Sequence, residues 1–302
     1  MKKTFPPWIR WRAPDPAMLQ SMQSLLKDLD LHTICESARC PNIGFCFARK
    51  TATFMILGDV CTRRCTFCGV KKGAPLPVDK NEPAAIAEAV RRLGLTYAVI
   101  TSVTRDDLAD GGASQFAEVI NRLHQLDMDI IVEVLIPDFK GSLDALRSVA
   151  NAGPQVINHN IETVRRLYPG VRPGAVYERS LALLADIKDI QPDIITKSGM
   201  MLGLGESAEE VIQAMRDLRN ADCDLLTMGQ YLRPSPNHHE IRSFIPPGMF
   251  SEYESMALEM GFKGAAAAPL VRSSFKADKL YQPAETTPKN IKNKARGRIH
   301  AE

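Results

Sequence analysis

Short apolar runs alternate with amphipathic helical patterns along most of the chain. Six runs rich in β-branched residues predict buried strands of a parallel sheet, because such strands are covered on both faces. They span 53–57, 98–103, 129–136, 156–160, 194–198 and 225–231. Helical patterns follow near 83–93, 114–126, 142–150, 177–187, 208–220 and 250–260. Six strand–helix units in series predict an α/β fold whose right-handed parallel sheet curls into a partial barrel.

Residues at the helix ends support several of these boundaries. Ser207 with Glu210, and Ser251 with Glu254, have the spacing of a capping box, in which each side chain bonds the other residue's backbone. Gly94 follows the helical pattern before it, as expected of a residue that ends a helix. We therefore predict helices that begin near the two serines and one that ends before Gly94.

The six units do not account for the whole chain. A full eight-stranded barrel takes about 250 residues, so the six units leave room for an extension before them. We predict an N-terminal extension at 1–50, a partial (β/α)6 TIM-like barrel at 51–275 and a basic, disordered tail at 276–302. Barrel enzymes place their sites at the carboxyl ends of the strands. Polar residues gather there, among them Ser102, Arg105, Glu133, Asn158, Asn160, Glu162, Lys197, Ser198, Gln230 and Arg233.

Composition and charge indicate a compact enzyme of the cytoplasm. Hydrophobic residues make up 45% of the chain and charged residues 24%, close to the globular average. The net charge of +3 equals that of 284–302, where five basic residues face two acidic ones. The rest of the chain therefore sums to zero, and we expect no basic face for nucleic acid. No segment has the apolar run of a signal peptide or a membrane span, so no membrane contact is expected.

Six of the seven cysteines fall into two triplets, which predict two metal centres. The first is spaced C-x4-C-x5-C and the second C-x3-C-x2-C; their members are Cys35, Cys40 and Cys46, then Cys61, Cys65 and Cys68. A closed tetrahedral metal site takes four protein ligands, whereas a triplet leaves one coordination position open. Each centre therefore has room for a ligand that is not cysteine.

Two structural alternatives fit this pattern less well. A disulfide framework is unexpected, because a chain of 302 residues can bury a core without covalent links. Structural zinc would need a second pair of ligands near Cys65 and Cys68, and His32 is the only histidine within 50 residues of the triplets. Iron–sulfur clusters fit three plus three better, because they require soft thiolate ligands.

The second triplet resembles that of radical S-adenosylmethionine enzymes, because Phe67 stands before the last cysteine in CTRRCTFC. With its other motifs, the chain resembles the lipoyl synthase family in particular. These are CESARCPNIGFCFARKTATFMILGDVC, TSVTRDDLADGGA (101–113), NHNIETVRRLYPGVRPGA (158–175), KSGMMLGLGE (197–206), LTMGQYLRPS (226–235) and PLVRSSF (269–275). The resemblance implies a three-quarter barrel for the core.

For the second triplet, the resemblance implies a 4Fe–4S cluster whose open iron binds S-adenosyl-L-methionine. Reductive cleavage of this cofactor gives a radical that removes hydrogen from an unactivated C–H bond. No side-chain base could do so, because an alkyl carbanion is far too basic. We expect Phe67, Asn158 and Lys197 to contact the cofactor, since they lie in the cluster loop or at strand ends. His238 and His239, in a proline-rich loop, are expected to be exposed rather than catalytic.

For the first triplet, the resemblance implies an auxiliary 4Fe–4S cluster completed by a serine of the RSSF motif. We favour Ser274 as this ligand, with Ser273 as the alternative; on sequence alone both fit a turn hydroxyl that bonds its own backbone. An alkoxide matches iron poorly, so the bond should be labile. Lability suits a cluster that is consumed, and Ser274 is therefore our candidate catalytic residue. By resemblance, this cluster donates sulfur to C6 and C8 of an octanoyl chain.

The resemblance also implies the partners. They are an octanoylated lipoyl carrier domain, from a 2-oxoacid dehydrogenase acyltransferase subunit or the glycine-cleavage H protein, and an electron donor such as ferredoxin or flavodoxin. Two departures from the family pattern stand near the serines: GAAAAPLV at 264–271 replaces a stretch that contains Ser-Gly, and Phe275 stands where tyrosine is common. Neither removes a cluster ligand.

Two other functions remain as alternatives. A biotin synthase-like enzyme would lack the first triplet. A two-cluster electron carrier would have little reason for six strand–helix units.

Overall fold

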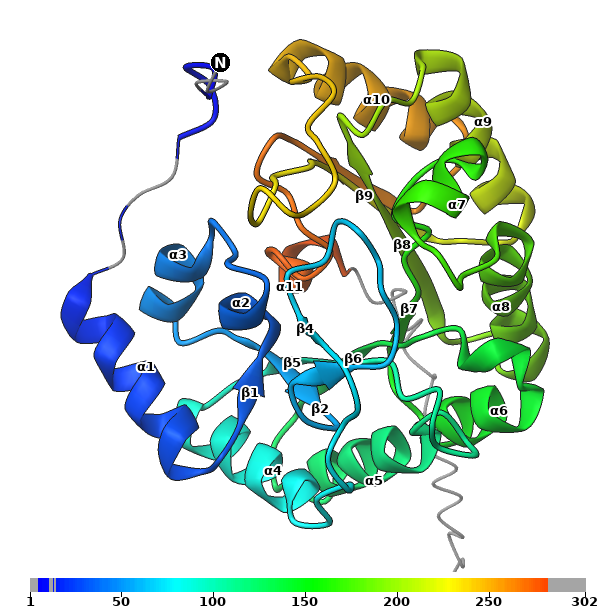
Figure 1. The fold of residues 1–302 in the computed structure, drawn as a ribbon. Helices are drawn as coiled ribbons and strands as arrows, with labels where there is room; N and C mark the ends of the chain where they lie inside the picture. Colours follow the sequence, from blue (N-terminus) through cyan, green and yellow to red (C-terminus); the bar gives the residue numbers. More distant parts are fainter. Residues whose placement is uncertain (1–4, 11–12, 14, 282–302) are drawn as a thin grey trace, which may run out of the picture.

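The computed structural model describes residues 5–10, 13 and 15–281. Its main sheet has eight strands in the order β1-β2-β5-β6-β7-β8-β9-β10 and is strongly curved, with helices α4, α5, α6, α8, α9 and α10 on its outer side (Figure 1). Neighbours from β2 to β10 are parallel, and only β1 is antiparallel. Among the described residues no pairing joins β1 to β10, so the barrel stays open on one side.

The strands of the main sheet are short. They are β1 (His32–Thr33), β2 (Thr53–Ile56), β5 (Tyr97–Ser102), β6 (Ile131–Leu135), β7 (Val156–Asn158), β8 (Ile195–Leu202), β9 (Leu225–Gln230) and β10 (Gly264–Ala267). A separate ribbon pairs β3 (Val60–Cys61) with β4 (Lys71–Lys72).

The helices follow the chain around the sheet. They are α1 (Pro16–Asp28), α2 (Ile34–Ser37), α3 (Ile43–Ala48), α4 (Glu82–Leu93), α5 (Ala113–His124), α6 (Leu143–Asn151), α7 (Tyr168–Val171), α8 (Tyr177–Ile190), α9 (Ala208–Asn220), α10 (Pro247–Glu259) and α11 (Ala277–Leu280). Two single turns of 3₁₀ helix are η1 (Phe139–Gly141) and η2 (Arg165–Leu167). Among the described residues no helix is long and apolar enough to cross a membrane.

All six predicted strands are present, and the sheet gains one strand at each edge. At one edge β10 is a seventh parallel strand that was not predicted, because GAAA carries no β-branched side chain. Gly264 packs closely there: a Cβ on it would lie 3.1 Å from Leu225 Cδ2, so the leucine would have to shift slightly. At the other edge β1, from the predicted N-terminal extension at 1–50, adds an antiparallel strand to the sheet. That segment therefore continues the barrel sheet.

The helix ends confirm two predictions. Ser207 Oγ accepts from Glu210 N at 3.3 Å, and Glu210 Oε2 accepts from Ser207 N at 2.8 Å, as a capping box requires. Gly94 ends α4 with a φ of 64°, which glycine adopts without the strain of a Cβ. These devices fix the first turn of α9 and the last turn of α4.

The predicted capping box at Ser251 and Glu254 is wrong. Helix α10 begins earlier, at Pro247, so Ser251 lies inside it and donates to the Pro247 carbonyl. Glu254 Oε2 instead accepts from Ala267 N at 2.7 Å and ties the helix to β10. Proline at the start of a helix has no N–H to satisfy, so it serves as the start signal that the serine was expected to give.

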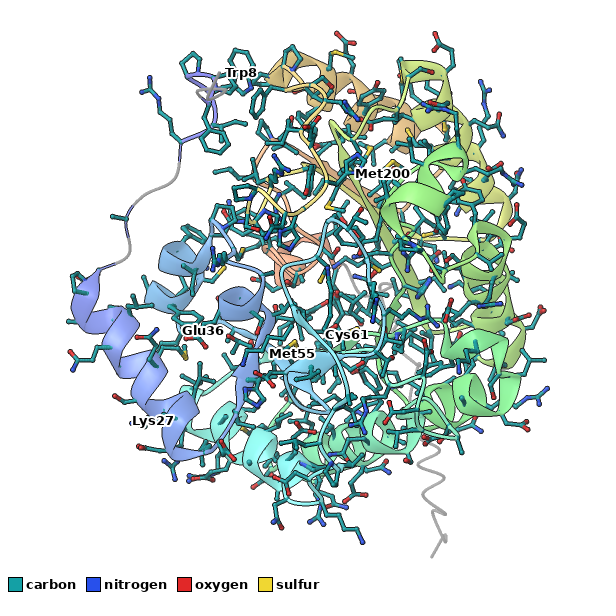
Figure 2. The ribbon with its side chains drawn as sticks, in the orientation of Figure 1. Trp8, Lys27, Glu36, Met55, Cys61 and Met200 are labelled. Atoms are coloured by element: carbon teal, nitrogen blue, oxygen red, sulfur yellow. The ribbon has the colours of Figure 1, made fainter. Side chains whose placement is uncertain are left out.

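The apolar core lies mainly between the sheet and the helices. In α5, for example, Phe116, Val119, Ile120 and Leu123 are fully buried, and each such side chain stabilises the fold by roughly 1.5–3 kcal/mol. The inner face of the sheet also buries charged groups, among them Glu133 and Lys197. Figure 2 shows side chains filling the space inside the sheet, with Cys61 near its centre.

The tail predicted at 276–302 lies largely outside the described residues. Its first part forms α11, a single helical turn next to β10. Residues 282–302, which include the basic stretch, are not described.

Candidate functional site

A cavity of about 330 Å³ lies at the carboxyl ends of the parallel strands, as expected for a barrel enzyme. Strand-end residues form its wall, including Ser102, Leu135, Asn160 and Gly199. Other parts of its wall come from segments that are far apart in the sequence. These are helix α2, the loop of the second cysteine triplet and residues 271–274. The cavity therefore brings together the second cysteine triplet, two cysteines of the first triplet and the RSSF segment.

The second triplet lines this cavity with all three of its cysteines, Cys61, Cys65 and Cys68. Cys61 ends β3, and the other two lie in the loop that returns to β4. Burial, with the neighbouring cysteines, raises the pKa of Cys68 to about 12, and burial raises that of Cys65. Because the thiolate is the metal ligand, a bound cluster must displace these protons.

The histidines of the proline-rich loop hold the cluster loop in place. His239 N donates to the Thr66 carbonyl at 2.9 Å, and His238 Nε2 lies 3.1 Å from the Cys68 carbonyl. The expectation that both are exposed is wrong, because each is only partly exposed. The cluster loop that they contact lies about 170 residues earlier in the sequence, so no local sequence pattern could have identified these hydrogen bonds.

The first triplet lines a second cavity, of about 260 Å³, together with Ser274. Cys35 and Cys40 line both cavities, whereas Cys46 lines only the second. Burial, with Cys40 and Cys46 nearby, raises the pKa of Cys35 to about 12, and burial with Cys40 nearby raises that of Cys46 to about 11. The two cavities are therefore neighbours that share Cys35 and Cys40 in their walls.

The serine segment reaches the first triplet through contacts with β9 and the N-terminal segment. Asn42 Nδ2 donates to the Leu270 carbonyl at 2.7 Å, and Gln230 N to the Pro269 carbonyl at 3.2 Å. Gly229 makes this approach possible, since a Cβ there would lie 2.0 Å from the Val271 carbonyl oxygen. A side chain at this one position of β9 would push the segment away from the cysteines.

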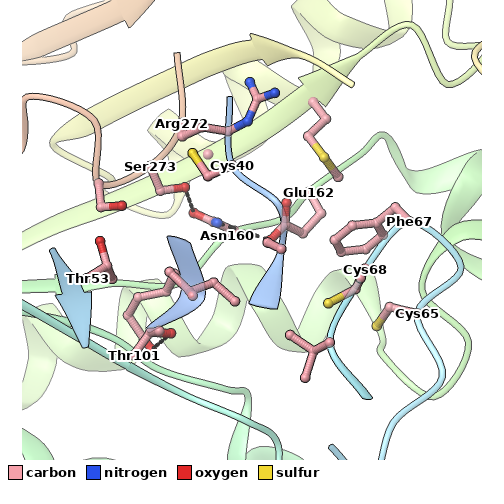
Figure 3. A pocket seen from close by; sticks show the side chains of 18 of the residues that line it. Cys40, Thr53, Cys65, Phe67, Cys68, Thr101, Asn160, Glu162, Arg272 and Ser273 are labelled. Carbon is pink, nitrogen blue, oxygen red and sulfur yellow. Dashed lines mark hydrogen bonds between the residues drawn. The ribbon is translucent and has the colours of Figure 1, made fainter. Parts of the chain in front are cut away.

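The two serines differ in their surroundings. Ser274 lines both cavities and shares the second with all three cysteines of the first triplet. Ser273 lines only the larger cavity, and its Oγ donates to Asn160 Oδ1 at 2.9 Å (Figure 3). The Ser273 hydroxyl is therefore bonded to Asn160, and of the two serines Ser274 is the one that shares a cavity with all three cysteines of the first triplet.

Of the three predicted cofactor contacts, only Phe67 lines the cavity; Asn158 and Lys197 do not. Lys197 Nζ lies 2.8 Å from Glu133 Oε1, with both side chains buried. Asn158 Nδ2 and the Tyr97 hydroxyl donate to the same carboxylate, at 3.4 and 2.6 Å. A buried charge needs such partners, because an unpaired one costs several kcal/mol.

Strand length explains why these two side chains lie below the cavity. Strand β8 was expected to end at Ser198 but runs to Leu202, so Lys197 sits in its first half. The chain after β7 continues along β8, with His159 N bonded to the Lys197 carbonyl and Glu162 N to the Gly199 carbonyl. The cavity wall is therefore formed by residues that lie nearer the carboxyl end of β8 than Asn158 and Lys197 do.

Asn160, Glu162 and Arg172 form this part of the cavity wall. Asn160 Nδ2 donates to Glu162 Oε1 at 3.0 Å, and Arg172 Nη1 to the Asn160 carbonyl at 2.8 Å. Burial raises the pKa of Glu162, against the opposing effect of the Arg172 and Arg272 charges. Glu162 also has a φ of 65°, an uncommon backbone conformation for a residue other than glycine. Sequence reasoning placed Asn160 and Glu162 near a strand end but did not select them.

The donor set fits iron–sulfur clusters and a polar cofactor. Among the described residues no three His, Cys, Asp or Glu side chains are placed to hold one metal ion, but in a 4Fe–4S cluster each thiolate binds a different iron. Ser102 Oγ and Arg172 Nε, from residues that line the cavity, are buried without a protein partner. Figure 3 shows Cys65, Cys68 and Phe67 on one side, Cys40 and Ser273 on the other, and Glu162 between.

Comparison with known proteins gives a family for this arrangement. The model of the radical SAM superfamily matches residues 55–218. The lipoyl synthase of Caldanaerobacter subterraneus subsp. tengcongensis is 55% identical over 273 residues, which cover 90% of this chain and 95% of that protein. The lipoyl synthase of Thiobacillus denitrificans is 52% identical over 278 residues, covering 92% and 89%.

Solved structures resemble the fold at much lower identity. HydG, a hydrogenase maturase, aligns with a TM-score of 0.58 and 13% identity over 84% of this chain and 57% of that one. Methylornithine synthase aligns with a TM-score of 0.51 and 12% identity over 91% and 90%. These similarities support the partial barrel and nothing more specific.

Proposed function

The chain belongs to the lipoyl synthase family of radical S-adenosylmethionine enzymes, and from this premise we propose that it inserts two sulfur atoms at C6 and C8 of a protein-bound octanoyl group. One observation carries the assignment: a single cavity is lined by all three cysteines of one triplet and two of the other. An enzyme that generates a radical at one centre and takes sulfur from another needs both beside one substrate.

In this proposal Cys61, Cys65 and Cys68 hold the radical cluster, and Cys35, Cys40, Cys46 and Ser274 hold the auxiliary one. When bound, the clusters and S-adenosyl-L-methionine supply the hydrogen abstraction and the sulfur that no side chain can supply. The residues bind and orient these groups. Residues 1–50 carry the auxiliary cysteines, and 51–275 form the barrel that ends in the serine motif.

We propose that Phe67, Asn160 and Glu162 contact S-adenosyl-L-methionine. Asn158 and Lys197, which were expected to do so, do not line the cavity. Asn160 and Glu162 line the cavity beside the radical-cluster cysteines, and the carboxylate of Glu162 suits the positive groups of the cofactor. Lys197 already neutralises Glu133 in the layer below. We propose that Asn158 and Lys197 support the cavity wall from beneath.

Two asparagines on one segment test this reassignment. Asn160→Ala should raise the dissociation constant of S-adenosyl-L-methionine about fivefold, since a lost hydrogen bond costs about 1 kcal/mol. Asn158→Ala, the matched control, should leave that constant within about twofold, and both variants should keep their iron. Binding is measured by equilibrium dialysis of the reconstituted protein. The opposite ranking of the two variants would restore Asn158 as a contact and remove Asn160.

The serine assignment has a similarly sharp test. Ser274→Ala should leave cofactor cleavage intact but stop formation of the lipoyl product, because the auxiliary cluster loses its fourth protein ligand. Ser273→Ala should be much milder, since that hydroxyl bonds Asn160. Ser274→Cys should bind the iron more firmly, because thiolate is the softer donor, and slow sulfur release.

The readout for the serine variants is single-turnover product formation beside iron content. Loss of product in Ser273→Ala with full product in Ser274→Ala would move the ligand by one residue. Full activity in both would make the motif a structural turn.

The cavity also suits the substrate. Apolar side chains line it, including Ile34, Val103, Leu135 and Ile136, and the hydrocarbon part of an octanoyl group is apolar. We propose that the chain arrives on an octanoylated lipoyl carrier domain, of a 2-oxoacid dehydrogenase acyltransferase subunit or the glycine-cleavage H protein. A small electron-transfer protein such as ferredoxin or flavodoxin would supply electrons.

Anaerobic reconstitution tests the function as a whole. The protein is mixed with S-adenosyl-L-methionine, a reductant and an octanoylated carrier peptide. Cofactor cleavage with sulfur insertion supports the proposal, whereas electron transfer without cleavage would identify a two-cluster electron carrier.

A further inference from the structure

The loop of the second triplet carries two adjacent arginines, one buried and one exposed. The side chain of Arg63 is 7% exposed, whereas Arg64 is exposed. Arg63 forms two bonds to Asp106, from Nε at 2.8 Å and Nη2 at 3.0 Å, and a third to Asp138. Arginine is suited to such a paired, planar contact. The cluster loop is thus tied to the segment after β5 and to the turn after β6.

The Asp138 carboxylate, one of the two partners of Arg63, has further partners of its own. The Asp138 side chain is fully buried; it also accepts from Lys140 N at 3.1 Å and lies 3.4 Å from Arg179 Nη1. The buried Asp138 carboxylate therefore has two arginine partners, Arg63 and Arg179. The Arg63 guanidinium holds the pKa of Asp138 at about 2, despite its burial. We call Arg63, Asp106 and Asp138 the arginine clamp.

Thr62 adds a second link between the same two segments. Its Oγ1 donates to the Thr104 carbonyl at 2.9 Å and accepts from Asp106 N at 3.1 Å. Its backbone N–H donates to the same carbonyl at 3.1 Å. Thr62 and Arg63 of the cysteine loop therefore hold residues 104–106 in place relative to that loop.

This fixed position brings one N–H to a cluster ligand. Thr104 N donates to Cys61 Sγ at 3.3 Å. An N–H bonded to a ligand sulfur stabilises negative charge, and a reduced cluster is more negative than an oxidised one. Such bonds are among the features that set cluster reduction potentials.

We propose that the arginine clamp and Thr62 are positioning residues that hold the Thr104 N–H against Cys61 and thereby raise the reduction potential of the radical cluster. None of them touches the cavity; each acts through the backbone of residues 104–106. The inference rests on the proposed function only in placing that cluster on Cys61, Cys65 and Cys68.

The test compares three variants of the full-length, fully reconstituted protein. Thr62→Val removes the hydroxyl without changing charge, Arg63→Gln removes the clamp, and Arg64→Gln removes the same charge from the exposed neighbour. The potential is read by electron paramagnetic resonance during a redox titration. The radical cluster is recognised by the change in its signal when S-adenosyl-L-methionine is added. Iron content and thermal midpoint are measured in parallel.

At the midpoint potential of the unsubstituted protein, Thr62→Val and Arg63→Gln should each lower the ratio of reduced to oxidised radical cluster about tenfold. This corresponds to about 59 mV for a one-electron couple. Arg64→Gln should stay within about twofold, because an exposed charge is screened by salt. All three variants should keep their iron.

Three results would overturn the inference. The first is an unchanged potential in both Thr62→Val and Arg63→Gln. The second is an equal shift in Arg63→Gln and Arg64→Gln with none in Thr62→Val, which would make charge alone the cause. The third is loss of iron from a folded Thr62→Val protein, which would make the link a means of retaining the cluster. If the unsubstituted protein gave no signal that responds to S-adenosyl-L-methionine, the proposed function would fail as well.

Discussion

Replacing Cys61, Cys65 and Cys68 together with alanine should lower the iron content from about eight to about four per chain and abolish cleavage of S-adenosyl-L-methionine. All three cysteines line the larger cavity from one loop, so the substitution removes every thiolate of one centre. The first triplet belongs to α2, α3 and the turn between them and should keep its iron. The two measurements are iron analysis and the amount of 5′-deoxyadenosine released.

A matched control is Cys223→Ala, which removes the one cysteine outside the triplets. Cys223 is fully buried between α9 and β9, and its Sγ donates to the Leu225 carbonyl. That variant should keep about eight irons and normal cleavage. Cofactor cleavage that survived loss of the three loop cysteines would place the radical centre elsewhere in the chain.

Replacing Cys35, Cys40 and Cys46 with alanine should have the complementary effect. Cleavage of S-adenosyl-L-methionine should continue, because the radical cluster keeps its own loop and the contacts from His238 and His239. No lipoyl product should form, because the sulfur source is gone. The iron content should again fall to about four per chain.

Product and cofactor cleavage are measured on the same sample, so that an unfolded variant, which would lose both, is recognised. Far-ultraviolet circular dichroism checks the fold, since Cys35 is a core residue. Lipoyl product from this variant would show that the first triplet does not supply the sulfur.

The periodic part of the fold was predictable because it depends on local pattern. Each strand from β2 to β9 in the main sheet lies in a short run rich in apolar and β-branched residues, a pattern typical of buried strands in a parallel sheet. Strand β10 was missed because its alanines are held by Glu254 and by the strand beside it, not by their own preference. Its position depends on tertiary packing, which overrides propensity.

The grouping of six cysteines into two triplets was predictable for a different reason, since cysteine spacing in the sequence is itself the signal. The cofactor wall was not, because it depends on register between strands. Lys197 and Asn158 were expected at the cavity, but β8 runs four residues beyond Ser198 and places them a layer below. The bond from Ser273 to Asn160 joins residues 113 positions apart. Contacts of this kind follow only from the folded chain.

The most direct test of the whole account is the origin of the inserted sulfur. The protein is reconstituted with iron and heavy-isotope sulfide, freed of unbound sulfide, and mixed with reductant, S-adenosyl-L-methionine and an octanoylated carrier peptide. The mass of the peptide is then measured by mass spectrometry after one turnover. We predict a lipoyl peptide that carries two heavy sulfur atoms. A peptide that stays octanoylated while the cofactor is cleaved, or a lipoyl peptide with light sulfur, would contradict the account.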